Sequence, residues 1–138
     1  MNNLLPIHFA PLQGYTDAAY RQAHARIFGG IDTYYSPFVR VEHGEIRRKD
    51  ARDIHPENNR NIHLIPQLIA SCPNKLEQIM SLLTEHNYQE ADINLGCPFP
   101  MLAKRHNGAG MLPYPEEVKD LLTAAIEQYP QILSLIHI

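Results

Sequence analysis

An amide side chain and a thiol stand together where a short apolar stretch of the chain ends. Residues 91–98 read ADINLGCP, so Asn94 lies near the end of the stretch, and Gly96 and Cys97 follow it directly. An amide can donate and accept hydrogen bonds, a glycine lets a ligand approach the backbone, and a thiol can transfer a proton. These residue types predict a site that binds a small ligand and moves a proton, although a small buried hydrophobic residue is the structural alternative for Cys97.

A second cysteine stands in a similar place, because Cys72 also follows an apolar stretch and precedes a proline. Position alone therefore does not select one of the two thiols. Two cysteines without a histidine at ligand spacing predict no metal site. A thiolate nucleophile would need a cationic neighbour, but the run Lys104–His106 is more typical of a solvated loop. A cysteine hydrolase is accordingly disfavoured.

Short apolar runs alternate with amphipathic stretches and would position these groups. We expect strands over 6–12, 31–39, 62–70 and 91–95, and helices over 17–28, 42–53, 73–87 and 115–129. This alternation predicts an α/β fold with parallel strands, either an open doubly wound sheet or a (β/α)8 barrel. No G-x-G-x-x-G follows the first strand, which disfavours the open sheet. A barrel needs about 250 residues, so four β–α units predict its N-terminal half.

Composition excludes several classes of protein. The 138 residues are 44% hydrophobic, with 12 Lys+Arg against 15 Asp+Glu, which is not typical of a disordered chain. No apolar run approaches the roughly 20 residues that cross a bilayer, and no signal peptide is expected. Two cysteines suit a reducing cytoplasm. The net charge of −3 does not favour nucleic-acid binding, and we interpret the basic residues between 47 and 52 as a solvated helix face.

Two motifs closely resemble those of one enzyme family. Residues 10–17, APLQGYTD, with Arg21, resemble the A-P-M-x-G-x-T-D…R opening of the tRNA-dihydrouridine synthases. Residues 92–98, DINLGCP, followed by GAGML at 108–112, resemble their D-x-N-x-G-C-P…G-x-x-L-L signature. The order and separation of the motifs also match, with PQLI at 66–69 between them, and the resemblance extends over about residues 5–132.

The resemblance implies an FMN-binding TIM barrel that reduces uridine in tRNA with NADPH as the source of hydride. Carried onto this sequence, the flavin-binding residues are Pro11, Leu12, Gln13, Gln67 and Asn94. Cys97 matches the catalytic cysteine and would be the general acid, because an ordinary thiol is mostly protonated at pH 7. Leu12 replaces the more common Met, and Ser36 stands where many members carry Thr before a Glu, so contacts of that Glu are not expected.

The same resemblance implies that residues 1–138 form only part of the FMN-binding barrel domain. The strand-5 lysine, the strand-6 histidine, the phosphate site and the helical tRNA-binding domain of the family are not found in these residues. We therefore expect the chain alone to be inactive. Its open sheet edge and uncovered apolar surface predict aggregation or dimerisation, and the sequence does not give the oligomeric state. Another FMN-barrel oxidoreductase, or a half-barrel that only pairs with another chain, is the alternative.

Residues 133–138, LSLIHI, stand where the family has its fifth strand. They match the translation of CTG TCT CTT ATA CAC ATC, the end of a transposon-based sequencing adapter. We therefore expect that the reading frame was cut by adapter sequence. The start of a genuine fifth strand is the alternative, because the segment is apolar.

Overall fold

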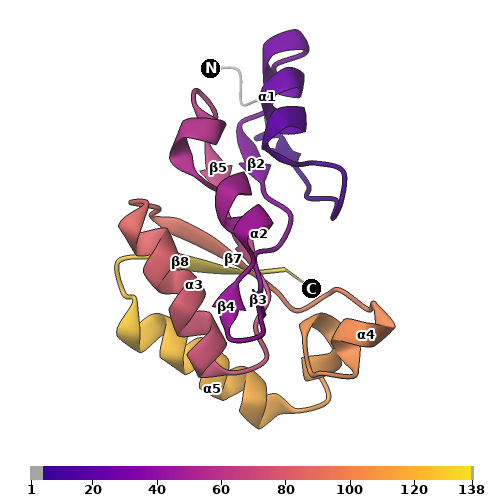
Figure 1. Cartoon of the computed structure of the whole chain (residues 1–138), viewed down its shortest axis with the longest axis vertical. Helices are drawn as coiled ribbons and strands as arrows, with labels where there is room; N and C mark the ends of the chain where they lie inside the picture. The colour runs from indigo at the N-terminus through magenta and orange to yellow at the C-terminus, as the bar shows by residue number, and fades with distance from the viewer. Residues whose placement is uncertain (1–4, 138) are drawn as a thin grey trace.

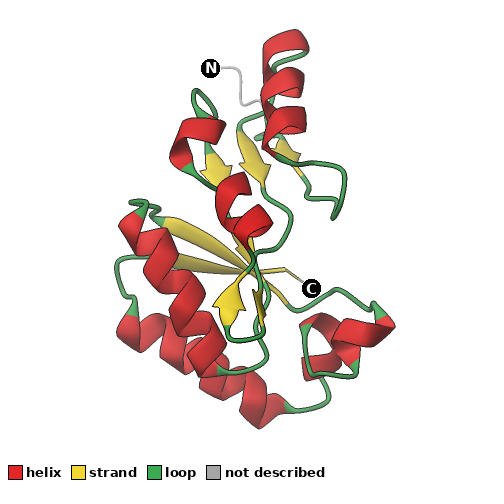
Figure 2. Cartoon of the chain, viewed as in Figure 1, coloured by secondary structure: helices red, strands yellow, loops and turns green. Residues whose placement is uncertain are grey.

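The computed structural model describes residues 5–137, and all strands of its two larger sheets run parallel (Figures 1 and 2). One sheet has the order β1–β2–β5, formed by His8–Phe9, Thr33–Tyr35 and Leu64–Ile65. The other has the order β6–β7–β8, formed by Gln67–Leu68, Glu90–Asn94 and Leu133–His137. The predicted α/β class with parallel strands is confirmed, whereas the half-barrel remains a prediction.

Prolines interrupt two of the predicted strands. Pro66 divides the third one into β5 and β6, because a proline has no N–H to donate to a neighbouring strand. Its carbonyl still accepts from the backbone N–H of Asp92 at 2.9 Å. The second strand is likewise interrupted near Pro37, beyond which Val39 forms a single parallel bridge with Leu68. These two strands therefore lie where the sequence predicts them but are shorter.

Three helices have nearly the predicted bounds: α1 (Ala18–Ile27), α3 (Pro73–Glu85) and α5 (Pro115–Gln128). The Asp17 carboxylate caps α1 by accepting from the backbone N–H of Tyr20 at 3.0 Å. The helices α3 and α5 begin with a proline, whose missing N–H has no partner in the first helical turn anyway. Local signals at the helix ends thus account for these bounds.

The predicted helix over 42–53 is wrong in its first half. Val41–Glu42 (β3) and Glu45–Ile46 (β4) instead form an antiparallel hairpin, and only Arg48–Asp53 are helical (α2). His43 and Gly44 connect the two strands with φ values of 52° and 84°. A two-residue turn of this hand matches the twist of paired strands and cannot continue a helix. A short 3-10 helix, η1 (Pro56–Asn59), follows within the predicted loop.

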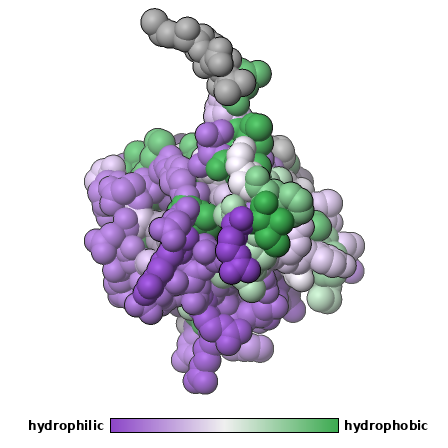
Figure 3. Space-filling view, turned by 90° about the horizontal axis from the view of Figure 1, so that it is seen from above, coloured by the Kyte–Doolittle hydropathy of each residue, from purple (hydrophilic) through white to green (hydrophobic). Residues whose placement is uncertain are grey.

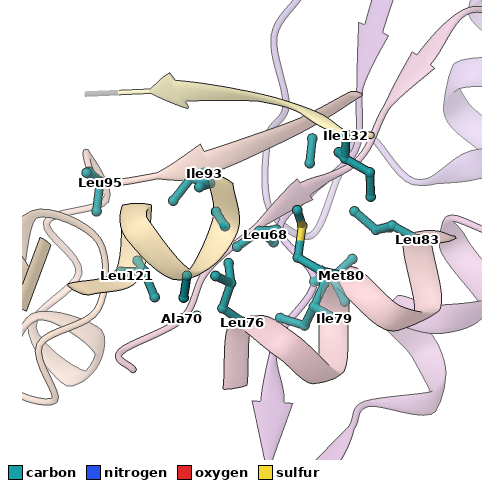
Figure 4. Packing of buried hydrophobic residues seen from close by; sticks show 14 of the residues in the cluster. Leu68, Ala70, Leu76, Ile79, Met80, Leu83, Ile93, Leu95, Leu121 and Ile132 are labelled. Atoms are coloured by element: carbon teal, nitrogen blue, oxygen red, sulfur yellow. The ribbon is translucent and has the colours of Figure 1, made fainter. Parts of the chain in front are cut away.

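The hydrophobic core lies between the sheet β6–β7–β8 and the two helices α3 and α5 (Figure 4). Leu76, Ile79, Met80 and Leu83 cover one side of α3 at helical spacing, and each is fully buried. They meet Leu68 of β6 and Ile93 of β7, with Leu121 of α5 beside them. This packing holds β6 and β7 side by side and so fixes where their carboxyl ends lie.

The loop between β7 and α5 is more ordered than the sequence predicts. It contains α4 (Pro100–Ala103) and η2 (Gly108–Met111), which bring the chain back onto the end of β7. The backbone N–H of Ala109 donates to the Cys97 carbonyl at 3.0 Å. A Cβ on Gly110 would lie 2.2 Å from the Ala103 carbonyl oxygen, so the two backbone segments touch directly.

The first and last strands of the chain, β1 and β8, lie at sheet edges. Within residues 5–137, β1 pairs only with β2, and β8 only with β7. Ile27 and Phe28 at the end of α1 are 66% and 77% exposed, and Figure 3 shows hydrophobic patches on a mostly hydrophilic face at this end of the molecule.

None of the helices described is long and apolar enough to cross a membrane. Residues 133–137 form a strand, as the fifth-strand alternative predicts, while their adapter origin remains untested.

A buried arginine joins α1 to the segment around α2. The Arg21 side chain is fully buried, and its guanidinium donates to the Asp53 carboxylate at 3.0 Å and to the Asn59 side-chain oxygen at 2.8 Å. It also donates to the carbonyls of Thr16 and Asp53. The Asp53 carboxylate in turn accepts from the Ala18 backbone N–H at 2.6 Å. These bonds compensate the charge that folding removes from water.

We expect Arg21→Met to destabilise the protein strongly. The change leaves the Asp53 carboxylate, whose side chain is 11% exposed, without its cation. Removing one partner of a buried ion pair costs about 3–5 kcal/mol in the free energy of unfolding, measured here by urea denaturation. The exposed Arg26 on the same helix gives the matched control, Arg26→Met, with an expected change within about 0.5 kcal/mol. Equal effects would contradict the structural role of Arg21.

Gly110→Ala should destabilise the protein by about 1–3 kcal/mol, because the added Cβ meets main-chain atoms of Ala103. Shortening the Ala103 side chain cannot relieve that contact. In a double-mutant cycle followed by urea denaturation, Gly110→Ala and Ala103→Gly should therefore have additive effects. Rescue of Gly110→Ala by Ala103→Gly would show that the close contact is not between the two backbones.

Candidate active site

Gln67, Asn94 and Cys97, three of the residues predicted for the site, form one hydrogen-bonded group. Gln67 lies in β6, and Asn94 is the last residue of β7. The Asn94 side-chain nitrogen donates to Gln67 Oε1 at 3.0 Å. Asn94 Oδ1 accepts from the backbone N–H of Cys97 at 2.9 Å and from that of Gly96 at 3.2 Å. The Asn94 amide therefore connects the neighbouring strand to the backbone that carries the thiol.

A buried carboxylate completes this group. Asp92 is 2% exposed, and its Oδ2 accepts from Gln67 Nε2 at 2.6 Å, with His137 Nδ1 3.5 Å from the same oxygen. Burial raises the pKa of the nearby Tyr35 hydroxyl, and the negative charges of Asp92 and Glu90 raise it further. Asp92 was not predicted as a site residue from the sequence. A charged residue inside the apolar stretch ADINL was the available signal, because carboxylates are seldom fully buried without a partner.

The segment predicted to contact flavin from the first strand is held in a tight turn. The Leu12 N–H donates to Thr16 Oγ1 at 2.8 Å, and its carbonyl accepts from the backbone N–H groups of Tyr15 and Thr16. Pro11 is half-buried, Gln13 is exposed, and the Leu12 side chain is 57% exposed. An apolar side chain on a fixed backbone is thus available to a ligand.

Side chains also connect the ends of successive strands. Gln13 Oε1 accepts from the Phe38 backbone N–H at 3.1 Å, which connects the end of the first strand to that of the second. Ser36 Oγ accepts from the Gln67 backbone N–H at 3.0 Å, which connects the second strand to the third. The Gln67–Asn94 bond then reaches the fourth. This role of the buried Ser36 was not predicted.

The structure distinguishes the two free cysteines, both half-buried. Cys97 is held at both backbone groups, by Asn94 at its N–H and by the Ala109 N–H at its carbonyl. Gly108 packs against it, with φ of 56° and room for no Cβ, because that atom would lie 2.7 Å from the Cys97 carbonyl oxygen. Cys72 instead precedes α3, and its carbonyl accepts from the Leu76 N–H. Only Cys97 is joined to the amides of the candidate site.

The basic residues near α2 lie as the sequence analysis predicts. Arg48, Lys49 and Arg52 are exposed, and Arg47 Nε lies 3.4 Å from a carboxylate oxygen of Glu42. Acidic residues thus offset part of the positive charge. Of the run 104–106, Lys104 and Arg105 are exposed, and His106 Nδ1 bonds to the Glu117 carboxylate at 2.8 Å. No group of three metal-ligating side chains occurs in the part of the chain that the structure describes.

Comparison with known protein families gives a match along most of the chain. The family model described as dihydrouridine synthase matches residues 8–135, which include every residue predicted for the candidate site. The chain is similar to tRNA-dihydrouridine synthase B of Vibrio cholerae, with 27% identity over 125 residues. It is also similar to tRNA-dihydrouridine(16) synthase of Neisseria meningitidis, with 29% identity over 135 residues.

These matches cover 91% and 94% of the present chain but 37% and 40% of the two relatives. The protein from Escherichia coli strain K12, also a tRNA-dihydrouridine synthase B, is 26% identical over 85% of the chain and 36% of its own length. The chain thus spans about two fifths of the relatives that it matches. Because the family model covers nearly all of its residues, the chain belongs to the dihydrouridine synthase family.

Proposed function

We propose that this chain forms the part of a tRNA-dihydrouridine synthase that contacts flavin and donates the proton. The reaction is the reduction of the C5–C6 bond of uridine in tRNA, with NADPH or NADH as reductant and FMN as cofactor. Residues 1–138 would then be the N-terminal half of a (β/α)8 barrel domain. The observation that carries the proposal is the hydrogen-bonded group Gln67, Asn94 and Cys97 at the strand ends of a member of this family.

The residues present fit a flavin ring. Each of the amides of Gln67 and Asn94 uses one N–H hydrogen within residues 5–137 and has a second for a carbonyl oxygen or ring nitrogen. The exposed Leu12 would lie against the apolar part of the ring, with Pro11 and Gln13 contacting it through their backbone. FMN bound there would supply the hydride for C6 of the uracil, taken from the reduced nicotinamide.

Cys97 would hold the proton for the other carbon of the double bond. After hydride arrives at C6, C5 carries the developing negative charge and takes the proton from the thiol. The two backbone bonds of Cys97, to Asn94 and Ala109, fix where this thiol stands relative to the amides. Positioning of this kind lowers the barrier because the donor need not be brought into place for each reaction.

The same proposal has consequences for how the tRNA is bound and for the compartment in which the reaction takes place. A uridine can reach flavin and Cys97 only after it leaves the base stack. Contacts with the tRNA backbone require basic side chains, and those near α2 are solvated or lie beside carboxylates. We therefore assign most tRNA contacts to parts of the enzyme outside this chain. A cytoplasmic location suits both tRNA modification and the free thiols of Cys72 and Cys97.

Leu12→Asp should weaken FMN binding by about tenfold or more, because it replaces an apolar contact with a charge that must lose water. Binding is measured by quenching of flavin fluorescence when the protein made from the whole gene is titrated into FMN. Ile27→Asp is the matched control, since Ile27 is 66% exposed at the far end of α1. Equal FMN affinities of the Leu12→Asp and Ile27→Asp variants would contradict the proposed flavin contact.

Cys97→Ala should abolish uridine reduction while NADPH still reduces the flavin, because only proton donation to C5 is lost. Cys72→Ala, the matched control, should retain both steps. The measurements are flavin absorbance after addition of NADPH and the dihydrouridine content of tRNA, with the protein made from the whole gene. Loss of both steps in Cys97→Ala would rule out the general-acid role, and reduction of small enones or dihydroorotate in place of tRNA would favour another flavin oxidoreductase.

A further inference from the structure

The Asp92 carboxylate lies behind the amides of the candidate site. It is 2% exposed within β7, and its Oδ2 accepts from Gln67 Nε2 at 2.6 Å. Gln67 is equally buried, and its backbone N–H is already used by Ser36. A carboxylate buried in this way needs a donor, because removing the charge from water is costly. The side chain of Gln67 is the closer polar partner of Asp92, since His137 Nδ1 lies 3.5 Å from the same oxygen.

The charge of Asp92 determines which way the Gln67 amide faces. A carboxylate only accepts hydrogen bonds, so the Gln67 nitrogen must face it and Oε1 must face away. The reversed amide would place two oxygens 2.6 Å apart with no hydrogen between them. Oε1 then has the correct position to accept from the Asn94 nitrogen at 3.0 Å. The orientation of one amide follows from the charge, and the orientation of the second follows from the first.

The orientation of the Asn94 amide also determines its hydrogen bonds to the backbone of Gly96 and Cys97. Because the Asn94 nitrogen faces Gln67, its Oδ1 faces the backbone N–H groups of Gly96 and Cys97, at 3.2 and 2.9 Å. Both acceptor positions of Oδ1 are thereby used. A reversed Asn94 would place its NH2 group against these two donors and release the backbone. Four residues therefore form a directed chain of bonds: Asp92, Gln67, Asn94 and Cys97.

We propose that Asp92 is a positioning residue, which through its charge sets the hydrogen-bonding direction of Gln67 and Asn94 and holds the backbone of Cys97. A ligand then meets the remaining amide N–H hydrogens, so the site selects a ligand edge with carbonyl oxygens or unprotonated ring nitrogens. The choice of flavin as that ligand rests on the proposed function. The chain of bonds itself exists in the absence of a ligand and can be tested without one.

Asp92→Asn removes the charge and keeps the size of the side chain. The introduced amide can offer either its oxygen or its nitrogen to Gln67, so both amides lose their fixed direction. We expect the side-chain NH2 signals of Gln67 and Asn94 in the ¹⁵N spectrum of the 138-residue chain to shift or broaden. We also expect the Cys97 backbone N–H to exchange with solvent about fivefold faster, as for loss of one hydrogen bond. The exchange of core amides in α3 serves as the reference for any global change in stability.

Two further variants make the test specific. Asp50→Asn is the matched control, because Asp50 is a carboxylate with 7% exposure that accepts from the Arg40 backbone N–H and has no bond to the chain of amides. It should leave the signals of Gln67, Asn94 and Cys97 unchanged. The exchange variant Asp92→Asn/Gln67→Glu moves the carboxylate to position 67, where it can accept from both neighbouring amides. It should restore slow exchange of the Cys97 N–H, because Asn94 again has an acceptor for its nitrogen.

Unchanged signals in Asp92→Asn, no recovery in the exchange variant, or equal effects of Asp50→Asn would each overturn the proposal. Titration with FMN then separates it from the proposed function. If Asp92→Asn alters the amide signals and also weakens FMN binding about tenfold, both are supported. If the amide signals change as expected and FMN affinity does not, Asp92 is a positioning residue but the assignment of Gln67 and Asn94 to flavin is wrong.

Discussion

Burial of a carboxylate in a strand costs several kcal/mol unless donors compensate it, and in this chain Asp92 imposes that requirement on its neighbours. Gln67 meets it from the adjacent strand with a 2.6 Å bond. The two residues are directly opposite each other in the parallel register of β6 and β7. A shift of either strand by one residue would turn one of the two side chains to the other face of the sheet. The Gln67–Asp92 pair therefore specifies the register of β6 and β7 more strongly than the apolar core would alone.

The same constraint joins the site to the fold. Each strand end is attached to the next by a side chain: Gln13 reaches the second strand, Ser36 connects the second to the third, and Asn94 connects the fourth to the third. Arg21 fixes the first helix against the segment that follows the hairpin. The backbone around the predicted site is thus held by polar contacts, while α3 and α5 supply the apolar packing beneath it. Side chains placed in this way keep their geometry without the support of a ligand.

Much of this arrangement could be predicted from the sequence, for identifiable reasons. Helices α3 and α5 have apolar residues at helical spacing and a proline at their start, so periodicity and end signals agree. The hairpin at 41–46 was missed because its polar residues suit a helix, and the turn depends on a positive φ at His43 that its residue type does not announce. The motifs pointed to Gln67, Asn94 and Cys97. The bonds of Asp92 and Ser36 were not predictable, because they depend on which residues the strand register places opposite each other.

The contact of Gly110 with the backbone of Ala103 has a consequence for the evolution of this sequence. Where a larger side chain meets another side chain, a second mutation can make room, and sequences drift by paired exchange. Here the opposing atoms belong to the main chain, which is common to all amino acids, so no substitution at position 103 compensates a change at position 110. Lineages that keep this loop conformation must keep the glycine, whereas packing places no such limit on exposed positions such as Leu12.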